Sequence, residues 1–174
     1  MRDAPLPSRI FGSAVISPCG RYRYELTRSW DANRPTIAFV MLNPSTADAA
    51  EDDPTIRRCI GFANRWGFGE LRVYNCFALR ASNPEDLWPH EDPFGQDFDV
   101  WAKKPRECAK IVVAWGSFGS KGRNAARGRC FAIEHLKDLE LWALAINADG
   151  SPRHPLYVRA DQILTRWEIV GGGA

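Results

Sequence analysis

Four short apolar runs, each followed by a polar or glycine-containing signature, constrain the fold of this chain more than any other feature. They are TIAFVMLNPS (36–45), LRVYNCFALR (71–80), KIVVAWGSFGSKGR (110–123) and LELWALAINADGSPRHPLY (139–157). Runs of this length that are rich in Val, Ile and Leu, and do not alternate with polar residues, are typical of strands buried on both faces. We therefore predict parallel strands over 36–42, 71–76, 110–115 and 139–145.

The segments around these runs supply the other elements. Helical spacing or capping signals predict helices from Pro54 to Gly67, at 83–88, and over 95–108, 120–137 and 160–167. Residues 9–17 and 21–28 resemble two strands joined by the turn SPCG, which predicts an N-terminal hairpin or lid beside the sheet. Alternating strands and helices predict an α/β fold, a three-layer αβα arrangement around a central four-stranded parallel sheet. With 174 residues, we expect one domain over 1–174, with its core at about 36–158.

Charge and cysteine content limit the classes of partner and metal site that the chain is expected to have. The net charge of +2 favours no class of partner, but 121–129 carries four basic residues and no acid, and 48–53 carries four acidic residues and no base. The basic cluster is interpreted equally well as a phosphate footprint or as a solvated helix face. Five cysteines without a CxxC pair oppose a local zinc or iron–sulfur site. We expect reduced thiols, no cofactor, no metal, no membrane association, a cytoplasmic location and a monomer.

Parallel strands would gather the signature residues at one edge of the sheet. Asn43, Asn75, Trp115–Gly116 and His154 all follow predicted strands, and ligands of open α/β sheets bind at that carboxyl edge. Asn43 before Pro44 is explained well by a turn. Asn75 precedes apolar residues, which favours a recognition role for its carboxamide. A lone histidine is usually structural, but His154 lies in a loop directly after a strand.

These four signatures, in this order, resemble those of the uracil-DNA glycosylase superfamily. Leu42-Asn43-Pro44 resembles its water-positioning loop, and VYNCFALR with Asn75 resembles its uracil-reading strand. VVAWGSFGSKGR resembles its third motif, and His154-Pro155-Leu156-Tyr157 resembles its HP-containing loop. The stretch 36–158 also resembles a bacterial domain family of unknown function with NPSTAD, DDPTIRRC, WG and HPLY as hallmarks. That second resemblance is closer but implies no activity.

The superfamily resemblance implies hydrolysis of the N-glycosidic bond of uracil, or a related damaged base, in DNA. His154 would stabilise the departing base and Asn75 would read it, with Phe77, Phe62 or Trp66 stacking on it; each aromatic is equally well a core residue. Asn43, Asp48 or Asp52 would hold the water, whereas Asp53 is better explained by a helix entry. The DNA contacts would come from the following residues: Ser45, Ser117, Ser120, Lys121, Arg123, Leu156 and Tyr157.

Two departures from the superfamily pattern leave alternatives open. The first loop lacks the Asp-Pro-Tyr-His that activates water in many uracil enzymes, and no counterpart of the stacking Phe is obvious. A non-catalytic nucleic-acid or nucleotide-binding module on the same scaffold is the first alternative. A metal-dependent hydrolase using His154 or His90 with the acidic run is the second, and it ranks last because no HxH or HExxH pairing supports it.

Overall fold

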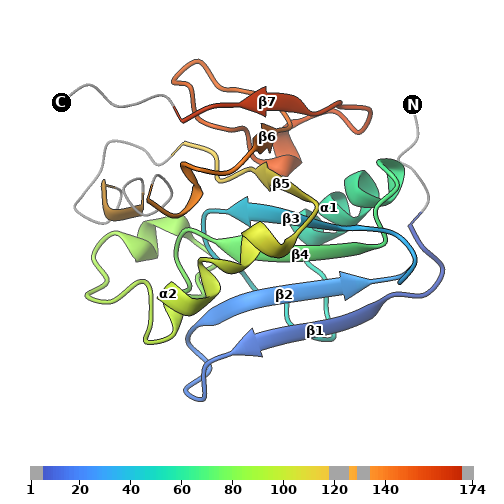
Figure 1. The fold of residues 1–174 in the computed structure, drawn as a ribbon. Coiled ribbons are helices and arrows are strands. Elements are labelled where there is room, and N and C mark those ends of the chain that lie inside the picture. The colour runs from blue at the N-terminus through green and yellow to red at the C-terminus, as the bar shows by residue number, and fades with distance from the viewer. Residues whose placement is uncertain (1–5, 118–125, 129–133, 170–174) are drawn as a thin grey trace.

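The fold is that of a computed structural model, described here over residues 6–117, 126–128 and 134–169. One seven-stranded mixed sheet runs through it in the order β1-β2-β4-β3-β5-β6-β7 (Figure 1). The strands are β1 (Phe11–Ile16), β2 (Arg23–Ser29), β3 (Thr36–Met41), β4 (Glu70–Asn75), β5 (Lys110–Val113), β6 (Leu141–Ala143) and β7 (Thr165–Trp167). The helical elements named in Figure 1 or below are α1 (Pro54–Arg65), α2 (Phe98–Trp101), η1 (Pro84–Leu87), η2 (Lys104–Glu107) and η3 (Pro155–Tyr157).

The four predicted parallel strands are confirmed as the centre of this sheet. β3 pairs in parallel with β4 on one side and with β5 on the other, and β5 pairs in parallel with β6. The last two strands are shorter than predicted, because pairing covers only 110–113 and 141–143. The order β4-β3-β5-β6 brings the four carboxyl ends to one edge of the sheet.

The prediction of a purely parallel, four-stranded sheet was wrong. The N-terminal hairpin does not lie beside the sheet but extends it, because β2 pairs antiparallel with β4. At the other edge, residues 165–167 form a strand antiparallel to β6 where a helix over 160–167 was predicted. Thr165 and Trp167 favour a strand, and pairing there covers backbone groups that β6 would otherwise leave exposed.

Side chains alternate along β3 between two cores on opposite faces of the sheet. Ile37, Phe39 and Met41 pack with α1 in one core. Ala38 and Val40 belong to the other, which includes residues of η1 and α2. Helical elements therefore cover both faces, as expected for a three-layer arrangement.

The predicted boundaries of α1 are confirmed by its caps. Asp53 accepts a hydrogen bond from the Ile56 amide at its side chain (2.8 Å), and Pro54 occupies the first turn, where its missing N–H costs nothing. Gly67 adopts a φ of +84° just beyond the helix, a conformation that favours glycine and ends the helix there. The Asn83 cap is also confirmed, although the element it starts is the 3₁₀ helix η1.

The long helix predicted over 95–108 was wrong. Only the short α2 and the 3₁₀ helix η2 form there. Pro105 explains the interruption, because proline donates no backbone hydrogen bond and disfavours the helical conformation in the residue before it. Of the helix predicted over 120–137, residues 126–128 and 134–136 are helical, and most of the remainder lies outside the described residues.

Candidate functional site

The loops that follow the central strands meet in pairs at the carboxyl edge. The Asn43 side chain donates to the Ala81 carbonyl (2.7 Å), and the Ala81 amide donates to the Pro44 carbonyl (2.9 Å), which joins the loops after β3 and β4. The Gly116 amide donates to the Pro152 carbonyl (2.9 Å), which joins the loops after β5 and β6. A Cβ at Gly116 would lie 3.8 Å from that of His154. The predicted signatures thus lie at one edge.

Asn75 ends β4 with a carboxamide that is almost completely buried, at 7% exposure. Within the described part of the chain its Nδ2 has no hydrogen-bond partner. The Nε of Arg23, a residue that is 3% exposed, is also buried and without a partner there. Both residues line one cavity of about 10 Å³, together with aromatic side chains that include Tyr24 and Trp101. A cavity of that size holds about one water-sized atom, and two unpaired donors make it a site for a hydrogen-bond acceptor.

Arg23 remains a cation in this setting. Burial lowers the pKa of Arg23 to about 10, while the nearby carboxylates of Asp53 and Asp48 act in the opposite direction. The guanidinium is held by a bond from Nη1 to the Ala47 carbonyl. The cavity therefore contains a charged donor, which the loop between β3 and α1 holds in place.

Asn43 uses its amide hydrogens within the fold. Nδ2 donates to the Pro44 carbonyl (2.9 Å) as well as to Ala81. This is the turn role that the sequence offered as the simpler explanation, and only the carbonyl oxygen of the side chain is left for a water.

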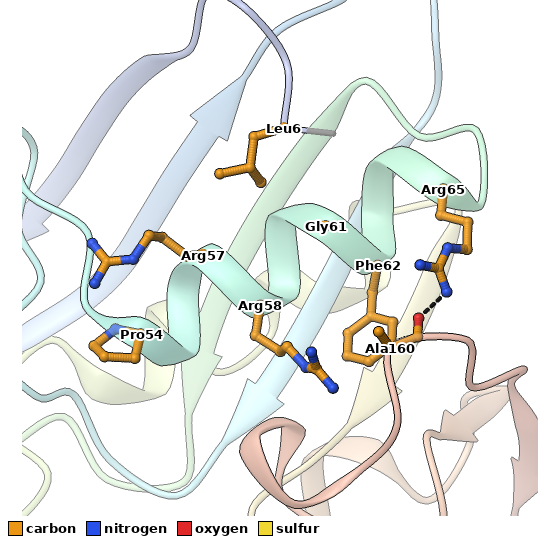
Figure 2. Close-up of a pocket in the computed structure, with 8 residues that line it drawn as sticks. All are labelled: Leu6, Pro54, Arg57, Arg58, Gly61, Phe62, Arg65 and Ala160. Atoms are coloured by element: carbon orange, nitrogen blue, oxygen red, sulfur yellow. Dashed lines mark hydrogen bonds between the residues drawn. The ribbon is translucent and has the colours of Figure 1, made fainter. Parts of the chain in front are cut away.

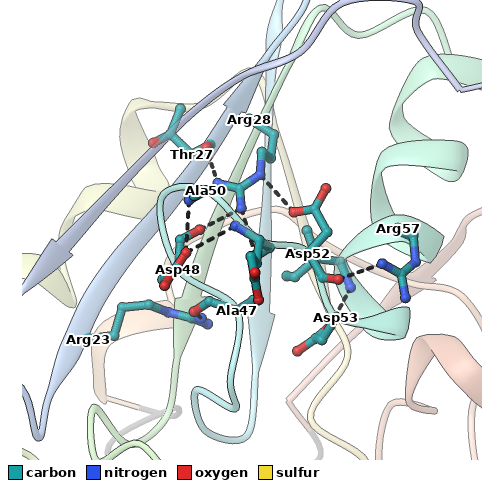
Figure 3. A network of polar contacts seen from close by, with 11 residues as sticks. Arg23, Thr27, Arg28, Ala47, Asp48, Ala50, Asp52, Asp53 and Arg57 are labelled. Atoms are coloured by element: carbon teal, nitrogen blue, oxygen red, sulfur yellow. Dashed lines mark hydrogen bonds and ion pairs between the residues drawn. The ribbon is translucent and has the colours of Figure 1, made fainter.

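The acidic run is organised around Arg28, which is 3% exposed (Figure 3). Its Nε donates to the Asp52 carboxylate (2.8 Å), and its Nη2 donates to the carbonyls of Asp48 and Glu51. The Asp48 carboxylate accepts the amides of Ala50 (2.8 Å) and Glu51 (3.0 Å), and these bonds lower the pKa of Asp48. The carboxylates of Asp48 and Asp52 thus hold the loop together.

His154 starts the 3₁₀ helix η3 and is half-buried. Its Nδ1 accepts the Leu156 amide (3.4 Å), so the neutral ring carries its proton on Nε2. Burial lowers the pKa of His154, and the charge of Asp53 opposes that shift. The imidazole is thereby kept neutral, with one N–H to donate.

The residues assigned to DNA contacts divide into three groups. Leu156 and Tyr157, which follow His154, are exposed at 44% and 75%. Ser45 is half-buried in the loop after β3, whereas the exposed Ser117 donates to Asp149 (2.7 Å), a bond that helps to lower the pKa of Asp149 to about 2. The other assigned residues, Ser120, Lys121 and Arg123, lie outside the described residues.

The aromatic residues considered for base stacking occupy core positions. Phe77 is fully buried and contacts Phe94 at a ring separation of 5.3 Å. Phe62 is 2% exposed and stacks on Trp66 (5.3 Å), which in turn stacks on Phe39. At these positions a base would have to displace core contacts to reach either phenyl ring.

Sequence reasoning missed two buried arginines. Arg23 and Arg28 lie on β2, which was predicted to be part of a lid, and no spacing signal separates them from the solvated arginines of an ordinary edge strand. It also missed a pocket of about 310 Å³ along α1, lined by Arg57, Arg58 and Arg65 (Figure 2). The pattern RRxxxxxxR in a helix without acids was the available signal.

Metal sites and membrane-spanning helices are two other features that the described residues could contain. Among residues 6–117, 126–128 and 134–169, no group of three or more His, Cys, Asp or Glu side chains is placed to hold a metal ion. In the same part of the chain, no helix has the length and apolar character needed to cross a membrane.

Comparison with known proteins identifies one relationship. Residues 23–156 match the model of a family described as "Protein of unknown function (DUF1643)". No curated protein and no solved structure matches the chain. The matched stretch runs from the first residue of β2 into η3, and so includes Arg23, Asn75 and His154.

Proposed function

We propose that this chain, which belongs to the DUF1643 family, is a DNA glycosylase that removes uracil or a related carbonyl-bearing base. The observation that supports the proposal most directly is the pair of unpaired donors, Asn75 Nδ2 and Arg23 Nε, in one cavity at the carboxyl edge. Uracil presents carbonyl oxygens where cytosine presents an amine. Two donors without partners therefore favour a base with a carbonyl at this position over one with an amine.

The size of the cavity limits what enters it. At about 10 Å³, it takes one oxygen atom rather than a whole ring. In our proposal a base carbonyl enters this cavity, and the rest of the base lies outside it. Because leaving a buried donor unpaired costs roughly 1–3 kcal/mol, satisfying both donors would contribute substantially to recognition.

Cleavage places negative charge on the departing base and positive charge on the sugar. The Arg23 guanidinium and the Nε2–H of His154 would stabilise the base, because both are donors held in place by the fold. Asp53 is the carboxylate that acts on His154 electrostatically, so it would stabilise the sugar cation. Asp48 and Asp52 would instead fix the loop that holds Asp53.

The experiment is incubation with a uracil-containing oligonucleotide, followed by alkali to break abasic sites. We expect Asn75→Ala to remove most excision without a loss of stability, because Nδ2 makes no hydrogen bond among the described residues. His154→Ala should slow excision about 10²–10³-fold, as is usual when one donor to a developing anion is lost. The exposed Asn33→Ala is the matched control. Wild-type excision by Asn75→Ala would contradict the proposal.

The same assay separates the two alternatives. Retention of uracil DNA without alkali-labile breaks would indicate a binding module. Breaks that are abolished by a chelator and restored by a divalent metal would indicate the hydrolase that uses His154 or His90.

A further inference from the structure

We propose that the pocket along α1 binds a short single strand of nucleic acid through its phosphates. This pocket, which we call the α1 groove, is lined by Arg57, Arg58, Gly61, Phe62, Arg65 and Ala160, among others (Figure 2). The inference does not require that the protein cleave any base. It concerns arginines to which neither the superfamily resemblance nor the proposed active site gives a role.

The charge of the groove comes from the composition of its helix. α1 reads PTIRRCIGFANR and contains three arginines and no acid. Arg57 donates to the Asp52 carbonyl (2.5 Å) and Arg65 donates to the Ala160 carbonyl. These contacts orient the guanidinium groups without neutralising them, because a backbone carbonyl bears no net charge. Within the described residues, neither Arg57 nor Arg65 forms an ion pair.

Two carboxylates near the groove, those of Asp161 and Asp52, are paired with other cations. Asp161, whose pKa is affected by Arg65, is paired with Arg159 through two bonds of 3.0 Å. Asp52 is paired with Arg28 (2.8 Å). The groove therefore keeps a positive field that an anion can use.

Gly61 leaves the middle of the groove open. Glycine in a helix interior is unfavourable, and at Gly61 no packing contact requires it, because an added Cβ would meet nothing within 4 Å. The missing side chain therefore creates space between Arg57 and Arg65, above a floor that includes Phe62. A strand lying along the helix needs such an open position between the cations that bind its phosphates.

The spacing and the direction of the groove favour a strand over a single anion. Arg57 and Arg65 are eight residues apart, or about 12 Å along the helix axis, and Figure 2 shows them near opposite ends of α1. At roughly 3.4 Å per nucleotide of a stacked strand, about four nucleotides span that distance. The helix begins at Pro54, and its N-cap Asp53 acts electrostatically on His154, so a strand bound here would lead toward the carboxyl edge.

The test measures binding of a fluorescent eight-nucleotide oligothymidylate, without uracil, by anisotropy at several salt concentrations. Arg57→Gln and Arg65→Gln should each weaken binding about 10-fold and each reduce the slope of log K against log salt by about 0.7. Gly61→Phe should weaken binding at least as much with no change in charge. Arg166→Gln, which removes an exposed arginine from β7, is the control for net charge and should bind as the wild type does.

Three results would overturn the inference: no binding of the oligonucleotide, wild-type binding by Gly61→Phe and both groove arginine variants, or equal displacement by hexaglutamate. Gly61→Ala tests whether the position tolerates a side chain, and it should melt at or slightly above the wild-type temperature. The excision assay is read separately. Groove binding without excision would refute the glycosylase proposal alone, and excision without binding of the oligothymidylate would refute the groove alone.

Discussion

Replacing Arg28 by methionine tests whether the acidic loop depends on one buried cation. The guanidinium, 3% exposed, donates to the Asp52 carboxylate and to the carbonyls of Thr27, Asp48 and Glu51. Methionine keeps much of the volume of the side chain but removes all of these donors. Breaking a buried pair by removing one partner costs about 3–5 kcal/mol. The Asp52 side chain is 22% exposed and can recover some hydration, so we expect the lower end, about 3 kcal/mol.

The free energy of unfolding can be measured by urea denaturation, followed through tryptophan fluorescence. For a chain of 174 residues, the expected loss corresponds to roughly 6–12 °C in Tm. Arg72→Met is the matched control, because Arg72 and Glu70 also pair at 2.8 Å but are 31% and 23% exposed. That pair should be worth about 0–1 kcal/mol. If Arg28→Met cost no more than Arg72→Met, Arg28 would not organise the loop.

Three further predictions concern the caps, the pH dependence and the thiols. Asp53→Ala should cost about 1 kcal/mol through the lost α1 cap and, by removing a nearby negative charge, should lower the pKa of His154 further in an NMR titration. Burial lowers the pKa of His154 below its value in the unfolded chain. The neutral ring therefore stabilises the fold above about pH 6.5, and this contribution is lost as the pH falls through the folded pKa. His154→Gln should flatten that part of the curve of stability against pH. The exposed Cys19, whose pKa is lowered to about 7 chiefly by the Ser17 hydrogen bond, should react with iodoacetamide in the native state. Cys59 and Cys76, buried thiols with raised pKa, should react only on unfolding, and peptide mass spectrometry would show any departure from this order.

The sequence predicted the central strands because their signal is local. An unalternated apolar run such as 36–42 reports burial on both faces, whatever its neighbours are. The Asp53 and Asn83 caps were likewise predictable, since a cap is decided within about four residues. The position of β7 was not, because Thr165–Trp167 becomes a strand only through pairing with β6. No pattern within 160–167 specifies that partner.

The same difference between local signals and long-range pairing applies to the candidate site. Asn75 and His154 were identified because each follows an apolar run, and a parallel sheet places such residues at one edge. Arg23 was missed because its importance comes from the antiparallel pairing of β2 with β4, which brings it beside Asn75. Whether an arginine on a strand is solvated or buried depends on what the strand pairs with, and that partner is remote in sequence.

The N-terminal hairpin is therefore better described as a support for the loop before α1 than as a lid. Arg23 and Arg28 both lie on β2; Arg23 reaches the Ala47 carbonyl and Arg28 reaches Asp52. These contacts tie the hairpin to the loop that carries Asp53, and Asp53 caps α1 and acts on His154. A change on β2 should thus be felt at the carboxyl edge through that loop. Arg28→Met should impair the function of the site even at temperatures where the protein stays folded. Arg72→Met, which removes the same charge, should not.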